Sequence, residues 1–186
     1  ASKKSFVQQV PEVVTVPNPK KKVAFFVGCF LNHSLINSAH SVVKVLSKND
    51  VEVTIPRDQP CCGLPQYVYG DFETAKAQAI KVMNAFDRHE AVITACGSCA
   101  SMLKKEMVEL FKDDPANKEK VEKFAAKCYE FSEYVAKELD TADKLHNSIP
   151  MTVTYHDPCH MVRYNKITAE PRSLLKSVPR LKFVEM

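Results

Sequence analysis

Five cysteines occur along the chain in three groups at nearly equal intervals. Cys29 comes first, the adjacent pair Cys61 and Cys62 follows, and Cys96 and Cys99 complete the pattern C-x31-C-C-G-x32-C-x2-C. Thiolates are ligands that zinc and iron–sulfur clusters select in proteins. Each interval is also long enough for one strand–helix–strand passage. We therefore expect these five sulfur atoms to meet at one inorganic site.

Glycine is scarce in this sequence and lies beside the thiols. The chain holds four glycines, and Gly28, Gly63 and Gly97 each adjoin a cysteine. Glycine tolerates positive φ and lets the backbone approach a bulky group closely. Glycines in these places indicate tight loops around a compact ligand.

The number of thiols discriminates between the candidate metal centres. A structural zinc ion takes four ligands in a tetrahedron, and five cysteines exceed that number. Several iron atoms in one cluster can share a larger set, and helix N-termini predicted after Cys29, Cys62 and Cys99 would favour its negative charge. The sequence therefore favours an iron–sulfur cluster, with zinc as an alternative. Metal-free dithiol chemistry stays open, because the segment 96–99 between a strand and a helix also resembles a thioredoxin motif.

Two further cysteines lie outside this pattern. Cys128 stands among helical sequence and is predicted to be a buried structural thiol. Cys159 follows a predicted strand and is either a further ligand or a free thiol. His156 and His160 flank it, and we expect them to hydrogen-bond locally and shape the loop, with metal ligation or proton donation as the alternative.

Composition excludes several classes of protein. Seven cysteines, an odd number, without a recognisable secretory signal argue against a disulfide scaffold and favour a cytoplasmic location. The 26 basic and 22 acidic residues give a net charge of +4, and the lysines are dispersed, so no nucleic-acid partner is expected. No apolar run approaches the ~20 residues that span a bilayer, so we expect membrane contact only through a partner.

Apolar periodicity predicts alternating strands and helices. Short continuous apolar runs indicate strands buried on both faces, and apolar residues at helical spacing indicate amphipathic helices. The expected strands are 23–27, 51–55, 91–95, 152–155 and 182–186, and a short strand near 128–131 is expected to interrupt helical sequence that continues through Leu139. The expected helices are 35–49, 71–88, 100–111, 133–139 and a short one that begins at Pro171. This order is typical of an α/β fold with a mainly parallel sheet.

The predicted fold class also positions the thiols. In a parallel sheet the carboxyl ends of all strands lie at one edge, where open α/β sheets place their sites. Cys29, the pair Cys61–Cys62, the pair Cys96–Cys99 and Cys159 each follow a predicted strand. The order of elements therefore predicts that these thiols gather at one edge of the sheet.

Six short segments carry a resemblance to a known family. They are Phe26-Val27-Gly28-Cys29-Phe30, Cys61-Cys62-Gly63-Leu64-Pro65, Cys96-Gly97-Ser98-Cys99, Ser132-Glu133-Tyr134, Tyr155-His156-Asp157-Pro158-Cys159-His160 and Pro171-Arg172-Ser173-Leu174-Leu175. From about residue 23 onward the chain resembles the cysteine-rich CCG domain found in the B subunit of heterodisulfide reductase. Related domains occur in the iron–sulfur subunits of glycolate oxidase, of anaerobic glycerol-3-phosphate dehydrogenase and of lactate-utilisation complexes.

The resemblance implies a Rossmann-like, three-layer domain that binds a noncubane [4Fe-4S] cluster, with zinc as a substitute. By position, the residues that match the cluster ligands are Cys29, Cys61, Cys62, Cys96 and Cys99. Family members usually carry two copies of the motif, and Cys159 matches the opening cysteine of the second copy. The second Cys-Cys-Gly that this copy would need does not occur before Met186.

These observations predict three parts of the chain. Prolines at 11, 17 and 19 indicate a linker over residues 1–21. The CCG domain is expected over 22–150, and the start of a second, truncated CCG repeat over 151–186. The compact cysteine run of ferredoxin-type clusters, which many relatives carry upstream, does not occur in this sequence.

The family resemblance implies two redox functions. In the first, the chain is an iron–sulfur subunit that passes electrons between a flavin-containing dehydrogenase subunit and a quinone or other acceptor, alongside other iron–sulfur subunits. In the second, the cluster itself cleaves a thiol disulfide, as in heterodisulfide reductase. A zinc-bound or metal-free assembly domain is the alternative outside redox chemistry. Membrane association, if any, is expected to be peripheral and through the complex.

Overall fold

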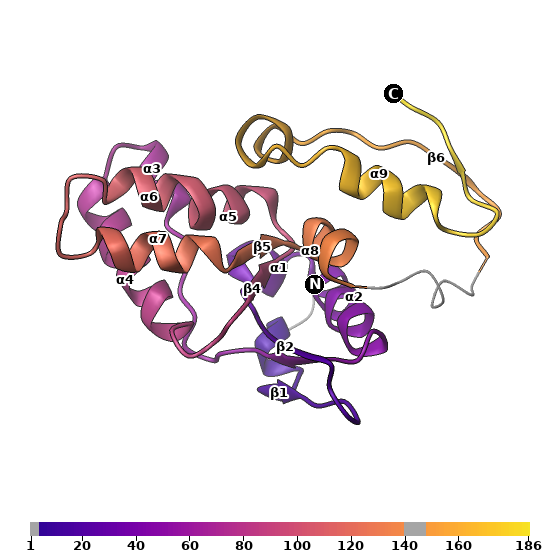
Figure 1. The fold of residues 1–186 in the computed structure, drawn as a ribbon, viewed down its shortest axis with the longest axis horizontal. Coiled ribbons are helices and arrows are strands. Elements are labelled where there is room, and N and C mark those ends of the chain that lie inside the picture. The colour runs from indigo at the N-terminus through magenta and orange to yellow at the C-terminus, as the bar shows by residue number, and fades with distance from the viewer. Residues whose placement is uncertain (1–3, 140–147) are drawn as a thin grey trace.

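The computed structural model describes residues 4–139 and 148–186, and its centre is a five-stranded sheet in the order β1-β3-β2-β4-β5 (Figure 1). The strands are β1 Val13–Val14, β2 Lys21–Phe25, β3 Val51–Thr54, β4 Val92–Thr94 and β5 Cys128–Glu130. β2 pairs in parallel with β3 and β4, and β4 pairs in parallel with β5, whereas β1 runs antiparallel to β3. The predicted mainly parallel sheet is confirmed.

Helices lie on both faces of this sheet and follow the strands in the chain. They are α1 Gly28–His33, α2 Ile36–Lys48, α3 Leu64–Val68, α4 Phe72–Ala85, α5 Gly97–Ser101, α6 Met107–Leu110, α7 Lys118–Ala126, α8 Phe131–Glu138 and α9 Ala169–Lys176. A 3-10 turn covers Phe6–Gln8, and π-helical segments cover Met102–Glu106 and His160–Asn165. The first π-helical segment divides the helix expected over 100–111. No helix within the described residues is long and apolar enough to cross a bilayer.

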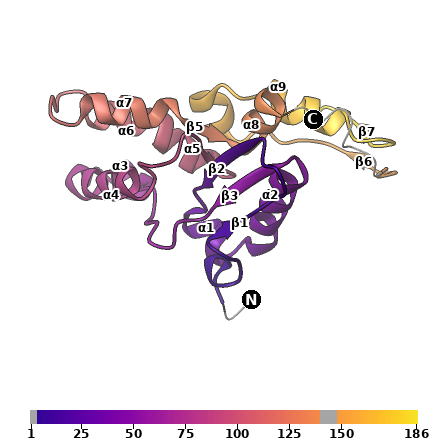
Figure 2. The same cartoon turned by 60° about the horizontal axis from the view of Figure 1, so that its bottom comes forward.

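The central strand β2 explains the three layers. Residues 23–27 are each at most 2% exposed. Val23 and Phe25 pack into an apolar cluster with α1, α2 and α8, whereas Ala24 and Phe26 pack into a second cluster with α4, α5, α6 and α7. Figure 2 shows α4, α6 and α7 to one side of the strands and α2 to the other. The strand needs a continuous apolar run because both of its faces are covered. The predicted three-layer α/β fold is confirmed.

The amino-terminal segment differs from the predicted linker over 1–21. Phe6 is fully buried, with its ring edge-on to Phe25 at a centroid distance of 6.0 Å. Val13 and Val14 pair with β3, and the Ile55 amide donates to the Glu12 carbonyl at 2.7 Å. Apolar residues in this proline-rich stretch thus cover one face and the edge of the sheet. Residues 6–14 are part of the folded domain.

The carboxy-terminal segment forms a second, smaller sheet. β6 (Thr152–Val153) pairs in parallel with β7 (Lys182–Phe183), and α9 forms the crossover between them. The strand predicted over 152–155 therefore does not join the sheet that carries the other thiols, which is a correction to the expectation of one shared sheet. Its physical reason is that β7, reached through a crossover of its own, satisfies the ladder hydrogen bonds of β6.

Candidate metal centre

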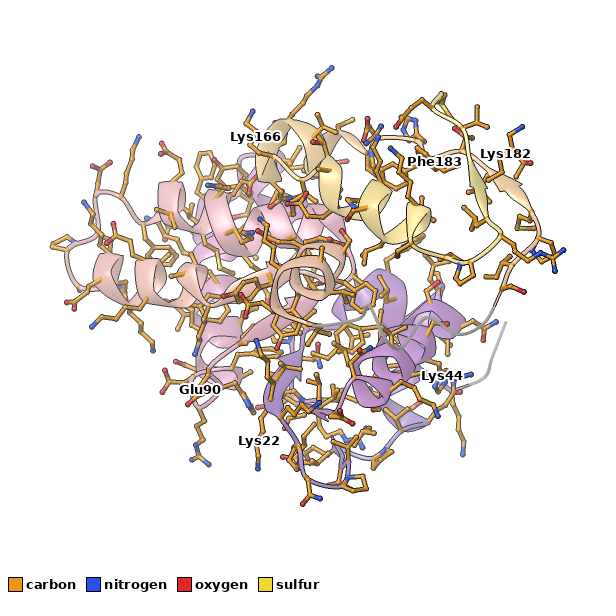
Figure 3. The ribbon with its side chains drawn as sticks, turned by 45° about the vertical axis from the view of Figure 1, so that its right-hand side comes forward. Lys22, Lys44, Glu90, Lys166, Lys182 and Phe183 are labelled. Carbon is orange, nitrogen blue, oxygen red and sulfur yellow. The ribbon has the colours of Figure 1, made fainter. Side chains whose placement is uncertain are left out.

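Three loops at the carboxyl edge of the five-stranded sheet carry the five predicted cysteine ligands. Cys29 follows β2, the pair Cys61–Cys62 follows β3, and Cys96 and Cys99 follow β4. Because β2, β3 and β4 are parallel neighbours, their following loops leave the sheet in the same direction. In Figure 3, Lys22 and Glu90 at the opposite, amino edge lie far from Lys166, which follows the π-helical segment His160–Asn165.

Four of the thiols form a continuous row. The Cys61 and Cys99 thiols lie near enough to Cys62 to shift its pKa, and Cys99 likewise lies near Cys96. Cys29 lies beside this row, near enough for its charge to raise the pKa of Cys61. The structure thus places the five cysteines of the sequence pattern in neighbouring loops at one edge of the sheet, and no three of them within the described residues are arranged to hold a single metal ion.

Gly28 allows the β2 loop to approach α5. A Cβ added at Gly28 would lie 3.1 Å from the Cys99 sulfur, and the residue has a φ of +69°. Both the space and the left-handed backbone therefore require glycine. Gly63 is left-handed as well, with a φ of +87°, and it is the residue at which α3 begins after the Cys61–Cys62 pair.

The row of thiols favours two of them as thiolates. The neighbouring Cys61 and Cys99 thiols lower the pKa of Cys62 to about 3, and the neighbouring Cys99 thiol lowers the pKa of Cys96 to about 6. Cys61 and Cys99 behave oppositely: the proximity of these sulfurs, together with burial, raises the pKa of Cys61 and of Cys99. A metal ligand must be deprotonated, so this arrangement prepares two of the thiols for coordination.

Gln59 fastens two of the thiol-bearing loops together. Its side-chain oxygen accepts a hydrogen bond from the Val27 amide at 2.7 Å, and its side-chain nitrogen donates to the Phe25 carbonyl at 3.3 Å and the Pro56 carbonyl at 2.9 Å. The loop before Cys61 is therefore tied to the turn before Cys29. Sequence reasoning missed this residue, because one glutamine in a loop has no periodicity or spacing to mark it.

The site is open on the side of Cys29. Cys29 is exposed and Cys61 is partly exposed, whereas Cys62 and Cys99 are 4% and 7% exposed. A cavity of about 160 Å³ adjoins Cys29 and Cys61 and is also lined by His33 and Gln59. A small molecule or a partner surface can reach the site from this side.

A buried carboxylate lies behind α5. Glu106 is 6% exposed, and the Ser101 hydroxyl, which also contacts the Ser98 carbonyl, lies 3.1 Å from one of its carboxylate oxygens. The other oxygen has no hydrogen-bond partner within the part of the chain that the structure describes. This polar group was also missed by sequence reasoning, since it occupies an ordinary helical position next to apolar neighbours.

The remaining two cysteines have different surroundings. Cys128 lies in β5, is 3% exposed and donates a hydrogen bond to the Phe124 carbonyl at 3.2 Å, and burial raises its pKa. It is buried, as expected. Cys159 is exposed at the start of the second π-helical segment, and His160 stacks on Tyr164 with ring centroids 5.0 Å apart.

Arg172 holds the loop that leads to Cys159. Its guanidinium donates to both Asp157 carboxylate oxygens at 2.8 Å and to Glu185 at 3.0 Å. This bidentate contact lowers the pKa of Asp157. The segment that resembles the opening of a second motif is thus fixed by its own ion pairs.

Comparison with known proteins agrees with this geometry. The family model of the cysteine-rich CCG domain matches residues 23–104 and 153–186. The chain belongs to the CCG cysteine-rich domain family. The predicted family resemblance is therefore confirmed. The first matched range contains the cysteine-bearing loops after β2, β3 and β4, and the second contains Cys159.

Relatives of this CCG domain occur in archaea and bacteria. A protein of Methanococcus maripaludis described as an uncharacterized iron–sulfur protein is 36% identical over 99% of this chain and 34% of its own length. The B subunit of fumarate reductase (CoM/CoB) from Methanothermobacter marburgensis is 30% identical over 98% of this chain and 34% of its own length. Lactate utilization protein A 1 of Bacillus cereus is 35% identical over 89% of this chain and 68% of its own length. The chain thus spans about a third of the archaeal relatives it matches.

Proposed function

We propose that this chain is an iron–sulfur redox subunit whose cluster is held by Cys29, Cys61, Cys62, Cys96 and Cys99. The observation that carries the proposal is the row of four neighbouring thiols with Cys29 beside it. A wholly thiol donor set suits iron–sulfur chemistry. The relative from Methanococcus maripaludis, which bears the name of an iron–sulfur protein, supports the same assignment.

The proposed cofactor is a [4Fe-4S] cluster of the noncubane type. Five thiols in a row exceed the four ligands that one zinc ion takes around a point, so they suit several iron atoms better. Such a cluster, when bound, accepts and donates single electrons.

The chain's own residues would hold and shape the cluster environment. Cys62 and Cys96 have lowered pKa values, so they would already be thiolates and could coordinate metal without first giving up a proton. Gly28 and Gly63 keep the loops close, and Gln59 fixes their separation. The exposed side at Cys29 would let electrons enter or leave near the surface.

The proposed partners are a flavin-containing dehydrogenase subunit and other iron–sulfur subunits, with a quinone or another molecule as acceptor. Two relatives support a role within a larger system: one bears the name of a reductase subunit and another that of a lactate utilization protein. Contact with a membrane would occur through such a partner.

We also propose that residues 151–186 begin a second CCG repeat. Cys29 follows Val23 of β2 by six positions, and Cys159 follows Val153 of β6 by six positions. In both places a helix then leads to a parallel neighbouring strand. The backbone supports this similarity between the two segments, because Asp50 before β3 and Arg180 before β7 both have positive φ.

The proposal is tested by metal analysis of the anaerobically purified or reconstituted protein. We expect about four iron and four sulfide per chain with the broad visible absorption of thiolate-bound iron. Zinc alone, or no iron after anaerobic reconstitution, would overturn the cluster assignment.

A second candidate function is disulfide cleavage at the same site, and the open side at Cys29 and Cys61 favours it. Two electrons and two protons convert a disulfide into two thiols, so the test supplies a chemically reduced, cluster-loaded protein with a thiol disulfide. Release of free thiol at catalytic rates would support this function. Reoxidation by a quinone with no thiol release would favour electron transfer.

A further inference from the structure

The π-helical segment His160–Asn165 lies directly against α5, which contains the Cys96-x2-Cys99 loop. The two elements are more than fifty residues apart in the chain, and they come from the two separately matched ranges of the CCG family model. Figure 1 shows the coiled turn before α9 next to α5. A residue of the second motif can therefore influence the thiols of the first.

Gly97 leaves the space that this contact needs. A Cβ added at Gly97 would lie 2.9 Å from Met161 Cγ and 3.1 Å from Met161 Sδ, closer than side chains pack. The backbone at Gly97 has no positive φ, so its conformation does not require glycine. The approach of Met161, which is 5% exposed, does require it.

Asn165 binds the same loop by hydrogen bonds. Its side-chain nitrogen donates to the Gly97 carbonyl at 3.1 Å and to the His160 carbonyl at 2.8 Å, and the residue is 9% exposed. The Ile167 amide closes the segment by donating to the Met161 carbonyl at 3.0 Å. The orientation of the segment on Gly97 is thus set by both packing and hydrogen bonds.

We propose that Met161 and Asn165 are positioning residues for the Cys96-x2-Cys99 loop, so that the opening segment of the second motif completes the thiol site of the first. They touch the peptide between the two cysteines and hold its carbonyl, which fixes the separation and direction of the two sulfurs. The importance of this positioning for a cluster rests on the proposed function. The positioning contacts themselves also exist in the metal-free chain.

A double-mutant cycle on the whole chain tests the packing contact. Gly97→Ala is expected to speed iodoacetamide labelling of the buried Cys99 by about fivefold in the metal-free protein, the change that losing one net contact of hydrogen-bond strength would give. Met161→Ala in the Gly97→Ala background is expected to recover most of this change, because it removes the clash. Peptide mass spectrometry measures the labelling. Independent, additive effects of the two substitutions would overturn the contact.

A second pair of variants tests the hydrogen bonds. Asn165→Ala is expected to speed labelling of Cys99 and to shift the reduction potential of the reconstituted protein. Arg163→Ala, on the exposed face of the same segment, is the control and is expected to change neither. Equal behaviour of the two variants would overturn the role of Asn165. Circular dichroism and thermal melting identify any variant that fails to fold. If Gly97→Ala is such a variant, labelling of Cys99 in Met161→Leu, Asn165→Ala and Arg163→Ala takes its place as the test.

The outcomes separate this inference from the proposed function. Labelling changes without any iron incorporation would retain the positioning role and remove the cluster. Normal iron incorporation with unchanged labelling and potential in every variant would retain the cluster and remove the positioning role.

Discussion

The Val27 amide donates a hydrogen bond of 2.7 Å to the Gln59 side chain, and this contact joins the loop after β2 to the loop after β3. Val27 and Phe25 are almost completely buried, so no water can replace Gln59 as the hydrogen-bond partner of their backbone groups. Cys29 and Cys61 stand two residues beyond Val27 and Gln59, respectively. The separation of these two thiols therefore depends on one amide side chain.

We expect Gln59→Ala to lower the free energy of unfolding by about 1–3 kcal/mol, because it leaves a buried amide without an acceptor. Denaturant titration measures this loss. The same variant should bind iron more weakly, measured as iron retained after chelator challenge. Gln8→Ala, which removes an exposed hydrogen bond from the Ser5 amide, is the control, and we expect it to lose less, about 0.5 kcal/mol, and to retain iron normally. Equal losses for both variants would show that Gln59 has no special role.

Gly63 and Gly70 allow a matched test of the loop after Cys62. Both have positive φ, +87° and +82°, but a Cβ at Gly63 would lie 3.3 Å from Gln78 Cβ, whereas a Cβ at Gly70 would meet nothing within 4 Å. Each alanine variant should lose roughly 1–2 kcal/mol of unfolding free energy from backbone strain, and Gly63→Ala should lose more. Only Gly63→Ala should also reduce iron incorporation. Equal iron content in the two variants would contradict the proposal that Gly63 shapes the loop that holds Cys62.

The sequence predicted most of what local residues determine. The run 23–27 predicted a strand buried on both faces, and Asp71 begins α4 by accepting a hydrogen bond from the Thr74 amide at 3.1 Å. Both features depend on neighbouring residues, where periodicity and capping are informative. The gathering of the five thiols followed from the parallel order of strands, since their loops must leave one edge.

The sequence could not predict contacts that depend on three-dimensional packing. β6 pairs with β7 instead of joining the main sheet, and no residue in a two-residue strand specifies its partner. The prolines around Phe6 and β1 predict a linker, yet an apolar face and a free strand edge hold these residues in the fold. The hydrogen bond from Asn165 to Gly97 spans sixty-eight positions and has no local pattern.

Serine substitutions separate ligand thiols from structural ones. Cys61→Ser or Cys62→Ser should abolish the visible iron–sulfur absorption, because each removes a sulfur from the row. Cys128→Ser should leave that absorption intact, since Cys128 bonds only to the Phe124 carbonyl in the core, although it should reduce stability. Absorption and iron content of the three reconstituted variants measure the difference. Equal loss in all three would show that the ligand assignment is wrong.

The pKa of Cys96 predicts how the metal-free protein reacts with iodoacetamide as pH changes. The thiolate is the reactive form, and the neighbouring Cys99 thiol lowers the pKa of Cys96 to about 6. Labelling of Cys96 should therefore rise through pH 6 and level off by about pH 7.5, whereas in urea it should keep rising toward an ordinary thiol pKa of about 8.5. Peptide mass spectrometry over this pH range measures both curves.

The same shift makes stability depend on pH with a definite sign. Because the pKa of Cys96 is lower in the folded state, its thiolate stabilises the fold fully above the unfolded pKa of about 8.5, and this contribution is lost as pH falls through about 6. Cys96→Ser should remove that part of the pH dependence in thermal melts between pH 6 and 8.5. If the folded and urea-unfolded labelling curves coincide, and the serine variant melts with the same pH dependence as the parent, then Cys99 does not hold its proton toward Cys96. The thiols would then lie farther apart than the lowered pKa of Cys96 indicates.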